Sequence, residues 1–239
     1  MKPILAILAC GSLFAAENLP ISGISHAGFR VADLEKTRAF YTGVLGFQQA
    51  FDQKDASGKT TLAVFKINED QFLEFSPGVP SGTADRFTHI AFLTDKLESL
   101  RQSVERLGFN PPEVRTGHDR TRNFSITDPD GHRVEFVQYE PDSMHAQARG
   151  KFADNRRIST HLPRVGIAVA DRNRALNYFS DSLGLASYIE LLPQGATTRL
   201  YFEVRNVKQA TQLLRGRGLT SSHIIDPDGT PIELVSGAR

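Results

Sequence analysis

Two histidines and two glutamates recur along the chain at nearly equal spacing. His26 precedes Glu74 by 48 residues, and His89 precedes Glu135 by 46. Imidazole nitrogens and carboxylate oxygens bind divalent first-row metals such as Fe, Mn, Ni, Co or Zn, whereas a thiolate-rich structural site needs several cysteines. The chain has a single cysteine, Cys10. The pattern therefore predicts a site for one divalent metal ion, provided that the fold brings the four side chains together.

The local pattern places all four side chains on strands and on the side facing away from the helices. Alternate residues of a strand share a face. In the first expected strand, Ala27, Phe29 and Val31 form an apolar face for helix packing, which leaves His26 and Arg30 on the other face. The same alternation turns the other candidates away from their apolar neighbours: Glu74 from Leu73 and Phe75, His89 from Ile90 and Phe92, and Glu135 from Val134 and Phe136.

These strands belong to a unit that the sequence repeats. ISHAGFRVADLEKTRAFYTGVLGF (24–47) and FTHIAFLTDKLESLRQSVERLGF (87–109) both pass from a strand to a helical stripe that ends in Leu-Gly-Phe. Asp33 is a suitable helix N-cap and Gly46 a suitable helix stop. Short strands are expected after each helix, at 48–52, 61–67 and 71–76 and then at 113–115, 123–127 and 133–139.

Two β-α-β-β-β units in tandem predict an α+β fold. A pseudo-twofold axis between the units would pair them into a curved, barrel-like mixed sheet with the helices outside. The two histidines and two glutamates would then meet on the concave face of that sheet. We expect this domain to span residues 21–140.

A shortened, degenerate copy follows at residues 161–239, after a polar stretch at 141–160 that is typical of a linker. VGIAVADRNRALNYFSDSLGL aligns without gaps with AGFRVADLEKTRAFYTGVLGF, and Asp-Pro-Asp-Gly occurs near the end of both copies. Only 13 residues (186–198) follow its first helix before the next expected strand, whereas the first copy has 41 (48–88). About two strands are therefore expected to be missing, including most of the strand equivalent to that of Glu74.

The shortened copy is predicted to bind no metal. Arg164 and Arg199 fall where His26 and His89 lie, and only Glu233 keeps its ligand type. His161 is three residues away from the ligand position, and an odd shift reverses the face of a strand. The copy would cover a sheet edge, pair with another subunit or bound the pocket, and the sequence leaves these alternatives open.

The first copy resembles the vicinal-oxygen-chelate superfamily, which includes glyoxalase I, bleomycin- and fosfomycin-resistance proteins, methylmalonyl-CoA epimerase and extradiol dioxygenases. The segments that carry the resemblance are HAGFRVADLEKTRAFYTGVLGF, FLEF, THIAF and DPDGHRVEF, which lie between residues 24 and 139. The resemblance implies the paired βαβββ fold of glyoxalases and dioxygenases. It also implies metal ligands at His26, Glu74, His89 and Glu135.

Bacterial glyoxalase I uses ligands in the order His, Glu, His, Glu, and all four are matched. The resemblance then implies a lyase or isomerase in which the metal is a Lewis acid toward a small substrate that chelates it through two oxygens. The catalytic group would be Glu135 or Glu74, moving a proton between adjacent carbons. Arg30 lies where that family carries an arginine near the substrate carboxylate. Arg122 is a further substrate-binding candidate.

An extradiol-type, ring-cleaving dioxygenase of catecholic aromatics is the alternative, because its ligand set of two histidines and one glutamate is also present. His118, in Thr-Gly-His before Asp-Pro-Asp-Gly, resembles part of that family's signature and is a third substrate-binding candidate. Ser125 stands where the signature has a tyrosine, and Glu74 would crowd an iron that needs positions for catecholate and dioxygen. We therefore favour the lyase. A second alternative is a non-catalytic protein that binds an antibiotic or another small ligand, against which the four retained ligand types argue.

Composition sets the expected partners. The chain is 40% hydrophobic and 23% charged with a net charge of +1, so no charge excess points to nucleic acid or to an anionic membrane surface. The expected partner is a small-molecule substrate. A homodimer is left open, as is the question of whether the site forms within one chain or between two.

The amino terminus has the pattern of a secretory signal peptide. MKPILAILACGSLFAAENLP contains one lysine, an apolar stretch from Ile4 to Ala16, and small residues suited to cleavage after Ala15 or Ala16. The stretch is short for a membrane span. Cys10 also lies in a sequence similar to a lipoprotein box. Residues 1–16 are therefore expected to direct a secreted or periplasmic location, with a cytoplasmic one as the alternative.

Overall fold

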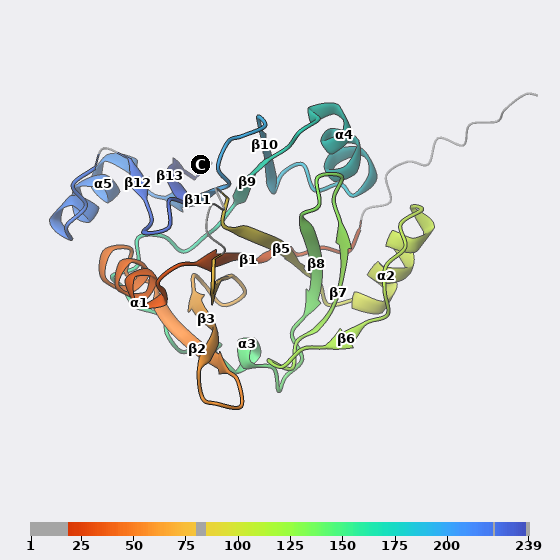
Figure 1. Ribbon diagram of the computed structural model, residues 1–239, viewed down its shortest axis with the longest axis horizontal. Coiled ribbons are helices and arrows are strands. Elements are labelled where there is room, and N and C mark those ends of the chain that lie inside the picture. Colours follow the sequence, from red (N-terminus) through yellow and green to blue (C-terminus); the bar gives the residue numbers. More distant parts are fainter. Residues whose placement is uncertain (1–18, 80–84, 222, 238–239) are drawn as a thin grey trace, which may run out of the picture.

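The computed structural model describes residues 19–79, 85–221 and 223–237. The chain folds into two mixed sheets with helices outside them, and the second sheet lies beside the first (Figure 1). Within the described ranges, no helix has the length and apolar character needed to cross a membrane. The signal peptide expected at residues 1–16 lies outside the described residues and stays a prediction.

The first sheet has eight strands in the order β2-β3-β4-β1-β5-β8-β7-β6. The leading strands of the two units, β1 and β5, are antiparallel neighbours at its centre, and each pairs in parallel with the last strand of its own unit, β4 or β8. This is the curved, pseudo-twofold sheet predicted from the repeat. The strands are β1 (Gly23–Val31), β2 (Gln48–Lys54), β3 (Thr60–Lys66), β4 (Phe72–Pro77), β5 (Phe87–Leu93), β6 (Arg115–Thr116), β7 (Arg122–Thr127) and β8 (Arg133–Gln138).

The first helix begins at the predicted N-cap, Asp33, but is less regular than its periodicity suggests. Asp33 accepts hydrogen bonds from the backbone N–H groups of Glu35 and Lys36, and Asp171 caps the equivalent helix of the shortened copy in the same way. Each of these helices soon widens into a π-helical turn, so the sequence periodicity spans two elements. The helical elements are α1 (Leu34–Arg38), η1 (Ala39–Val44), α2 (Leu97–Arg106), α3 (Met144–Gln147), α4 (Arg172–Leu176), η2 (Asn177–Ser182) and α5 (Val207–Gly216).

The second sheet has five strands in the order β10-β9-β11-β13-β12, which repeats the order β4-β1-β5-β8-β7 of the first. The strands lost from the middle of the shortened copy are therefore the counterparts of β2 and β3, and among the described residues the two-residue β6 has no counterpart either. The prediction that the counterpart of the Glu74 strand is largely deleted is wrong. Thirteen residues are too few for a hairpin plus a further strand, but they leave room for β10 alone. The strands are β9 (Arg164–Ala168), β10 (Ile189–Leu192), β11 (Arg199–Val204), β12 (Ile224–Ile225) and β13 (Pro231–Ser236).

The two Asp-Pro-Asp-Gly turns dock the two sheets on each other reciprocally. Asp228, in the turn of the shortened copy, accepts a hydrogen bond from the Ala32 backbone N–H at 2.7 Å. Asp130, the matching residue of the first copy, accepts one from the Ala170 N–H at 3.2 Å. Ala32 and Ala170 occupy the same place in the repeated Val-Ala-Asp motif. Together with an apolar core that contains residues of both copies, these turns hold the two sheets against each other.

Candidate metal centre

The four predicted ligands come from four adjacent strands of the first sheet, β4, β1, β5 and β8. All four side chains are buried, since the residues are 3 to 8% exposed. The strand register explains the meeting: Gly28 of β1 pairs with both Glu74 and His89, and Ala91 of β5 pairs with both His26 and Glu135. The four side chains, named here the metal centre, thus assemble within one chain.

Five of the six pairs of ligand-type atoms in the metal centre lie close to the mutual distances expected around one ion. Metal–ligand bonds of about 2.0–2.2 Å separate neighbouring ligand atoms by roughly 3–3.6 Å. The observed separations run from 3.0 to 3.7 Å. They are His26 Nε2 to His89 Nε2 (3.0 Å), to Glu135 Oε2 (3.3 Å) and to Glu74 Oε2 (3.7 Å), and His89 Nε2 to Glu74 Oε2 (3.5 Å) and to Glu135 Oε2 (3.7 Å).

Both imidazoles are oriented by hydroxyl groups outside the metal centre. His26 Nδ1 lies 3.0 Å from the Ser25 hydroxyl, which is itself 2.5 Å from the Tyr139 hydroxyl. His89 Nδ1 lies 2.9 Å from the Thr88 hydroxyl. Metal-binding histidines commonly hydrogen-bond through the ring nitrogen that does not face the metal, which fixes the ring. The arrangement leaves both Nε2 atoms directed at the same point, so the residues present fit a divalent ion.

The ionisation of the metal centre suits metal binding. Burial is the largest single influence and would raise the pKa of both Glu74 and Glu135, but the neighbouring histidines together outweigh it and lower both, that of Glu74 strongly. Burial is the largest single influence and would lower the pKa of His26, but the Glu74 and Glu135 carboxylates together outweigh it and raise that pKa. Burial lowers the pKa of His89. Both glutamates are therefore anionic near neutral pH. At His26, a proton competes with the metal ion.

We expect metal affinity to fall as the pH drops through the raised pKa of His26. A proton and a metal ion compete for the same Nε2, and in the metal-free protein this pKa lies above its ordinary value of 6.5. Metal binding near neutral pH should therefore release a proton from His26, whereas His89 is already neutral. Calorimetric titration in two buffers of different ionisation enthalpy measures this release. A dissociation constant that stays unchanged between about pH 6 and 8 would contradict the assignment of His26 as a ligand.

The three predicted substrate-binding residues do not contact the metal centre. Arg30 shares its strand face with His26, but its guanidinium is exposed and donates to the Gly78 carbonyl at 3.4 Å. Arg122 forms ion pairs with Glu98 and Glu140. His118 is exposed in the turn before β7. Arg30 alone stands on the correct face, and a substrate role for each of the three stays a prediction.

The structure adds a histidine that the sequence did not single out. His145, from α3 in the predicted linker, is completely buried, and its Nε2 lies 3.7 Å from Glu74 Oε1. Figure 1 shows α3 between the β2–β3 and β6–β7 arms of the first sheet. A four-residue helix in a polar stretch has no detectable periodicity, so pattern alone could not place it. The one available signal was its residue type.

The shortened copy offers a comparison at equivalent strand positions. Arg164 and Arg199 replace the histidines, and Glu190 and Glu233 keep the register of Glu74 and Glu135, so two of the four ligand types are retained rather than one. The place of Ala91 is taken by Tyr201, whose ring lies 5.0 Å below the Arg164 guanidinium. Arg199 also pairs with Glu233 at 3.4 Å. The position equivalent to the metal centre is therefore occupied by two arginine side chains and the Tyr201 ring.

Comparisons with known proteins agree with this geometry. The Glyoxalase/Bleomycin resistance protein/Dioxygenase superfamily profile matches residues 23–136. Lactoylglutathione lyase from Neisseria meningitidis is 30% identical over 123 residues, which cover 47% of this chain and 88% of that protein. 3-Methylcatechol 2,3-dioxygenase from Pseudomonas putida is 28% identical over 200 residues, 77% of this chain but only 64% of that longer protein. The Mn(II)-bound glyoxalase structure from Novosphingobium aromaticivorans superimposes with a TM-score of 0.70 at 19% identity, over 91% of this chain and 82% of that one.

Proposed function

The chain belongs to the glyoxalase/bleomycin resistance protein/dioxygenase superfamily, and on that premise we propose that it is a divalent-metal-dependent enzyme with glyoxalase I-type lyase or isomerase chemistry. Its substrate would be a small molecule that chelates the metal through two oxygens. The observation that supports this choice is the second carboxylate of the metal centre. Glu74 is buried, and its Oε2 lies 3.5 Å from His89 Nε2 and 3.7 Å from His26 Nε2, so it faces the same two histidine nitrogens as Glu135.

The residues of the metal centre would divide the work between holding the ion and moving a proton. His26 and His89 hold the ion through Nε2, with both rings fixed by hydroxyl groups. A bound divalent ion would supply the Lewis acid that makes a substrate C–H acidic enough for a carboxylate of low pKa to remove its proton. Glu74 or Glu135 accepts that proton on a carboxylate oxygen and returns it to the adjacent carbon. Burial of both carboxylates limits exchange of the proton with water.

The proposal is tested by assaying turnover with each candidate metal. Purified protein loaded with Ni, Co, Zn or Mn should isomerise hemithioacetals of 2-oxoaldehydes. The panel should include thiols other than glutathione, because an exported protein would meet little of it. Glu74→Gln and Glu135→Gln separate the two carboxylates: the proton carrier should lose roughly 10²–10⁴-fold in kcat, as for a general base, even when metal is saturating. Stoichiometric metal binding with no turnover of any hemithioacetal would overturn the proposal.

Extradiol ring cleavage is the second candidate, because the ligand atoms of His26, His89 and Glu135 also group together within 4.8 Å. The similarity to the catechol dioxygenase extends over 200 residues, 77% of this chain, and so reaches into the shortened copy. Two features weigh against it: Glu74 adds a second carboxylate, and Ser125, opposite Glu135 in the sheet, offers no phenol. Oxygen uptake on catechols by the Fe(II)-loaded protein would favour this candidate over the lyase.

A further inference from the structure

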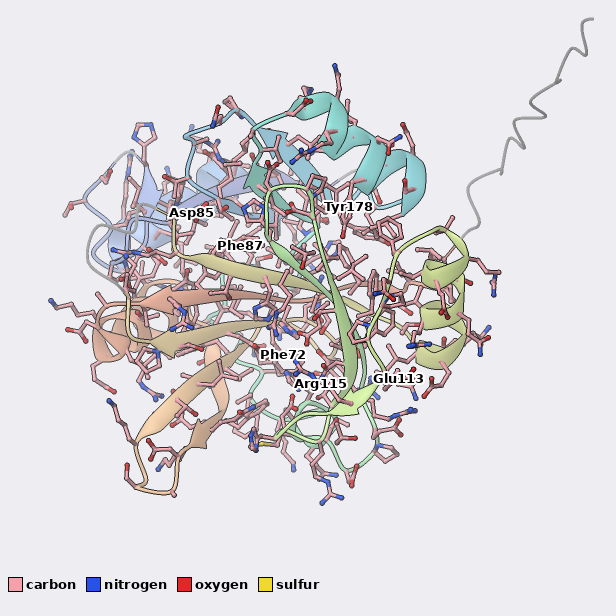
Figure 2. The ribbon with its side chains drawn as sticks, turned by 45° about the vertical axis from the view of Figure 1, so that its right-hand side comes forward. Phe72, Asp85, Phe87, Glu113, Arg115 and Tyr178 are labelled. Carbon is pink, nitrogen blue, oxygen red and sulfur yellow. The ribbon has the colours of Figure 1, made fainter. Side chains whose placement is uncertain are left out.

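His145 is placed at the edge of the metal centre by contacts on every side of its ring. The ring stacks on Tyr139, with centroids 4.6 Å apart and planes 4° from parallel. Phe72, labelled in Figure 2, meets it edge-on at 4.7 Å, and Phe51 does so at 5.0 Å. His145 is 0% exposed. An imidazole enclosed in this way has one orientation available to it.

The helix that carries His145 is itself fastened to the first sheet. The Met144 backbone N–H donates to the Asp119 carbonyl at 2.8 Å. On the other side, the buried ammonium group of Lys66 donates to the carbonyls of Ala148 at 2.7 Å and Lys151 at 2.8 Å. A buried lysine that is satisfied by these two carbonyls and by a carboxylate is costly to displace. The segment 144–151 is therefore a fixed part of the site.

The two ring nitrogens of His145 have different surroundings. Nδ1 lies 3.1 Å from an Asp119 carboxylate oxygen and 3.2 Å from the Thr121 hydroxyl. Nε2 is buried without a hydrogen-bond partner and points at Glu74, with 3.7 Å between it and Oε1. A buried polar nitrogen left unpaired is costly, so a hydrogen bond from Nε2 to Glu74 Oε1 would be favourable. The ring is anchored on its outer side and lacks a partner on its inner side.

Glu74 thus faces different groups with its two carboxylate oxygens. Oε2 is the atom nearest to His26 Nε2 and His89 Nε2, and Oε1 is the atom nearest to His145 Nε2. His145 approaches Glu74 from the oxygen that faces away from His26 Nε2 and His89 Nε2. It therefore stands behind Glu74 rather than among all four ligands. A carboxylate that binds a metal commonly has its other oxygen held by an outer partner.

We propose that His145 is a positioning residue for Glu74. Anchored by Asp119, it holds Oε1 of Glu74 and so commits Oε2 to the metal. The inference rests on the proposed function in so far as Glu74 is a metal ligand. It adds that the metal centre extends into the stretch between the two copies, through α3. A shift or loss of α3 would then change the coordination of the metal without altering any ligand.

The test compares two substitutions of His145 by their Co(II) binding. His145→Gln keeps an amide near the position of Nε2, whereas His145→Phe keeps the stack on Tyr139 and removes both nitrogens. We expect His145→Phe to weaken Co(II) binding by about 10–100-fold, as losing an outer partner does, and to change the visible Co(II) spectrum, which reports coordination number. His145→Gln should stay near wild type in both. His161→Phe, outside the metal centre, is the matched control.

Two outcomes would overturn the inference. One is a folded His145→Phe variant with wild-type Co(II) affinity and spectrum. The other is an equal loss in His145→Gln and His145→Phe, which would make His145 itself a ligand. If His145→Phe does not fold, Asp119→Asn repeats the test from the outer side of the ring. We expect Asp119→Asn to weaken Co(II) binding and to change the Co(II) spectrum. Wild-type affinity and spectrum in that variant would contradict the inference. These readouts are Co(II) binding and the Co(II) spectrum, not turnover. A negative hemithioacetal assay would therefore leave the role of His145 standing, and a negative result for His145 would leave the assay's result unaffected.

Discussion

Replacement of His89 with alanine is expected to abolish stoichiometric metal binding and turnover together. His89 Nε2 lies within 3.0 to 3.7 Å of the other three ligand-type atoms, so its removal deletes one corner of the metal centre. It also removes one of the histidines that face the two buried carboxylates. The loss in affinity should exceed the roughly 10–100-fold that loss of an outer partner costs. Competition with a chelating indicator measures it.

The matched control for this variant is His132→Ala. His132 also lies close to a strand of the first sheet, and its Nδ1 is 2.8 Å from Asp128 Oδ2, outside the metal centre. The hydrogen bond to Asp128 raises the pKa of His132, so its loss should cost stability mainly at low pH and leave metal affinity unchanged. If His89→Ala retained metal as well as His132→Ala does, His89 would not be a ligand.

Replacement of Gly28 with alanine is expected to empty the metal centre without changing any ligand. A Cβ atom on Gly28 would lie 2.1 Å from His89 Cε1, 2.4 Å from His89 Nδ1 and 2.8 Å from the Thr88 hydroxyl. These separations are shorter than atoms allow, and an imidazole held by its neighbours is not a flexible end that can bend away. His89 must leave its position or β1 and β5 must move apart. Overpacking of this kind typically costs about 1–3 kcal/mol of stability.

The measurement for Gly28→Ala is metal affinity beside the midpoint of thermal unfolding. Gly43→Ala is the matched control, because a Cβ there would meet no atom within 4 Å and its backbone is helical. We expect Gly28→Ala to lose metal to about the same extent as His89→Ala, and Gly43→Ala to bind like wild type. Wild-type affinity in a folded Gly28→Ala would show that the position of His89 does not matter for the ion.

The metal centre was the part most open to prediction from sequence, because two periodicities acted together. Strand alternation decided which face His26 and Glu135 occupy, and the repeat decided that the two units share one concave face. Both signals depend only on spacing. The small residues between the ligands, Gly28 and Ala91, are explained only by the register: each lies between a histidine and a glutamate of neighbouring strands.

What the sequence could not supply lies where no periodicity exists. His145 reaches the metal centre through a four-residue helix, and its place depends on Lys66 and Asp119, which are distant in the chain. The partners of Arg122 are also set by packing, since Glu98 comes from α2. In the shortened copy, chain length predicted how many strands are lost but not which ones. The shortened copy retains β10, which carries Glu190 and pairs with β9.

The measurement that tests the central claim most directly is the number of metal ions bound per chain. Protein saturated with Mn, Fe, Co, Ni or Zn, passed over a desalting column and analysed for metal, should carry one ion per chain. That ion should be absent from a Glu74→Gln, Glu135→Gln double variant that still folds. A ratio near zero for wild type, or an unchanged ratio in the double variant, would contradict a metal held by His26, Glu74, His89 and Glu135. A ratio near two would contradict the inference that the shortened copy binds none.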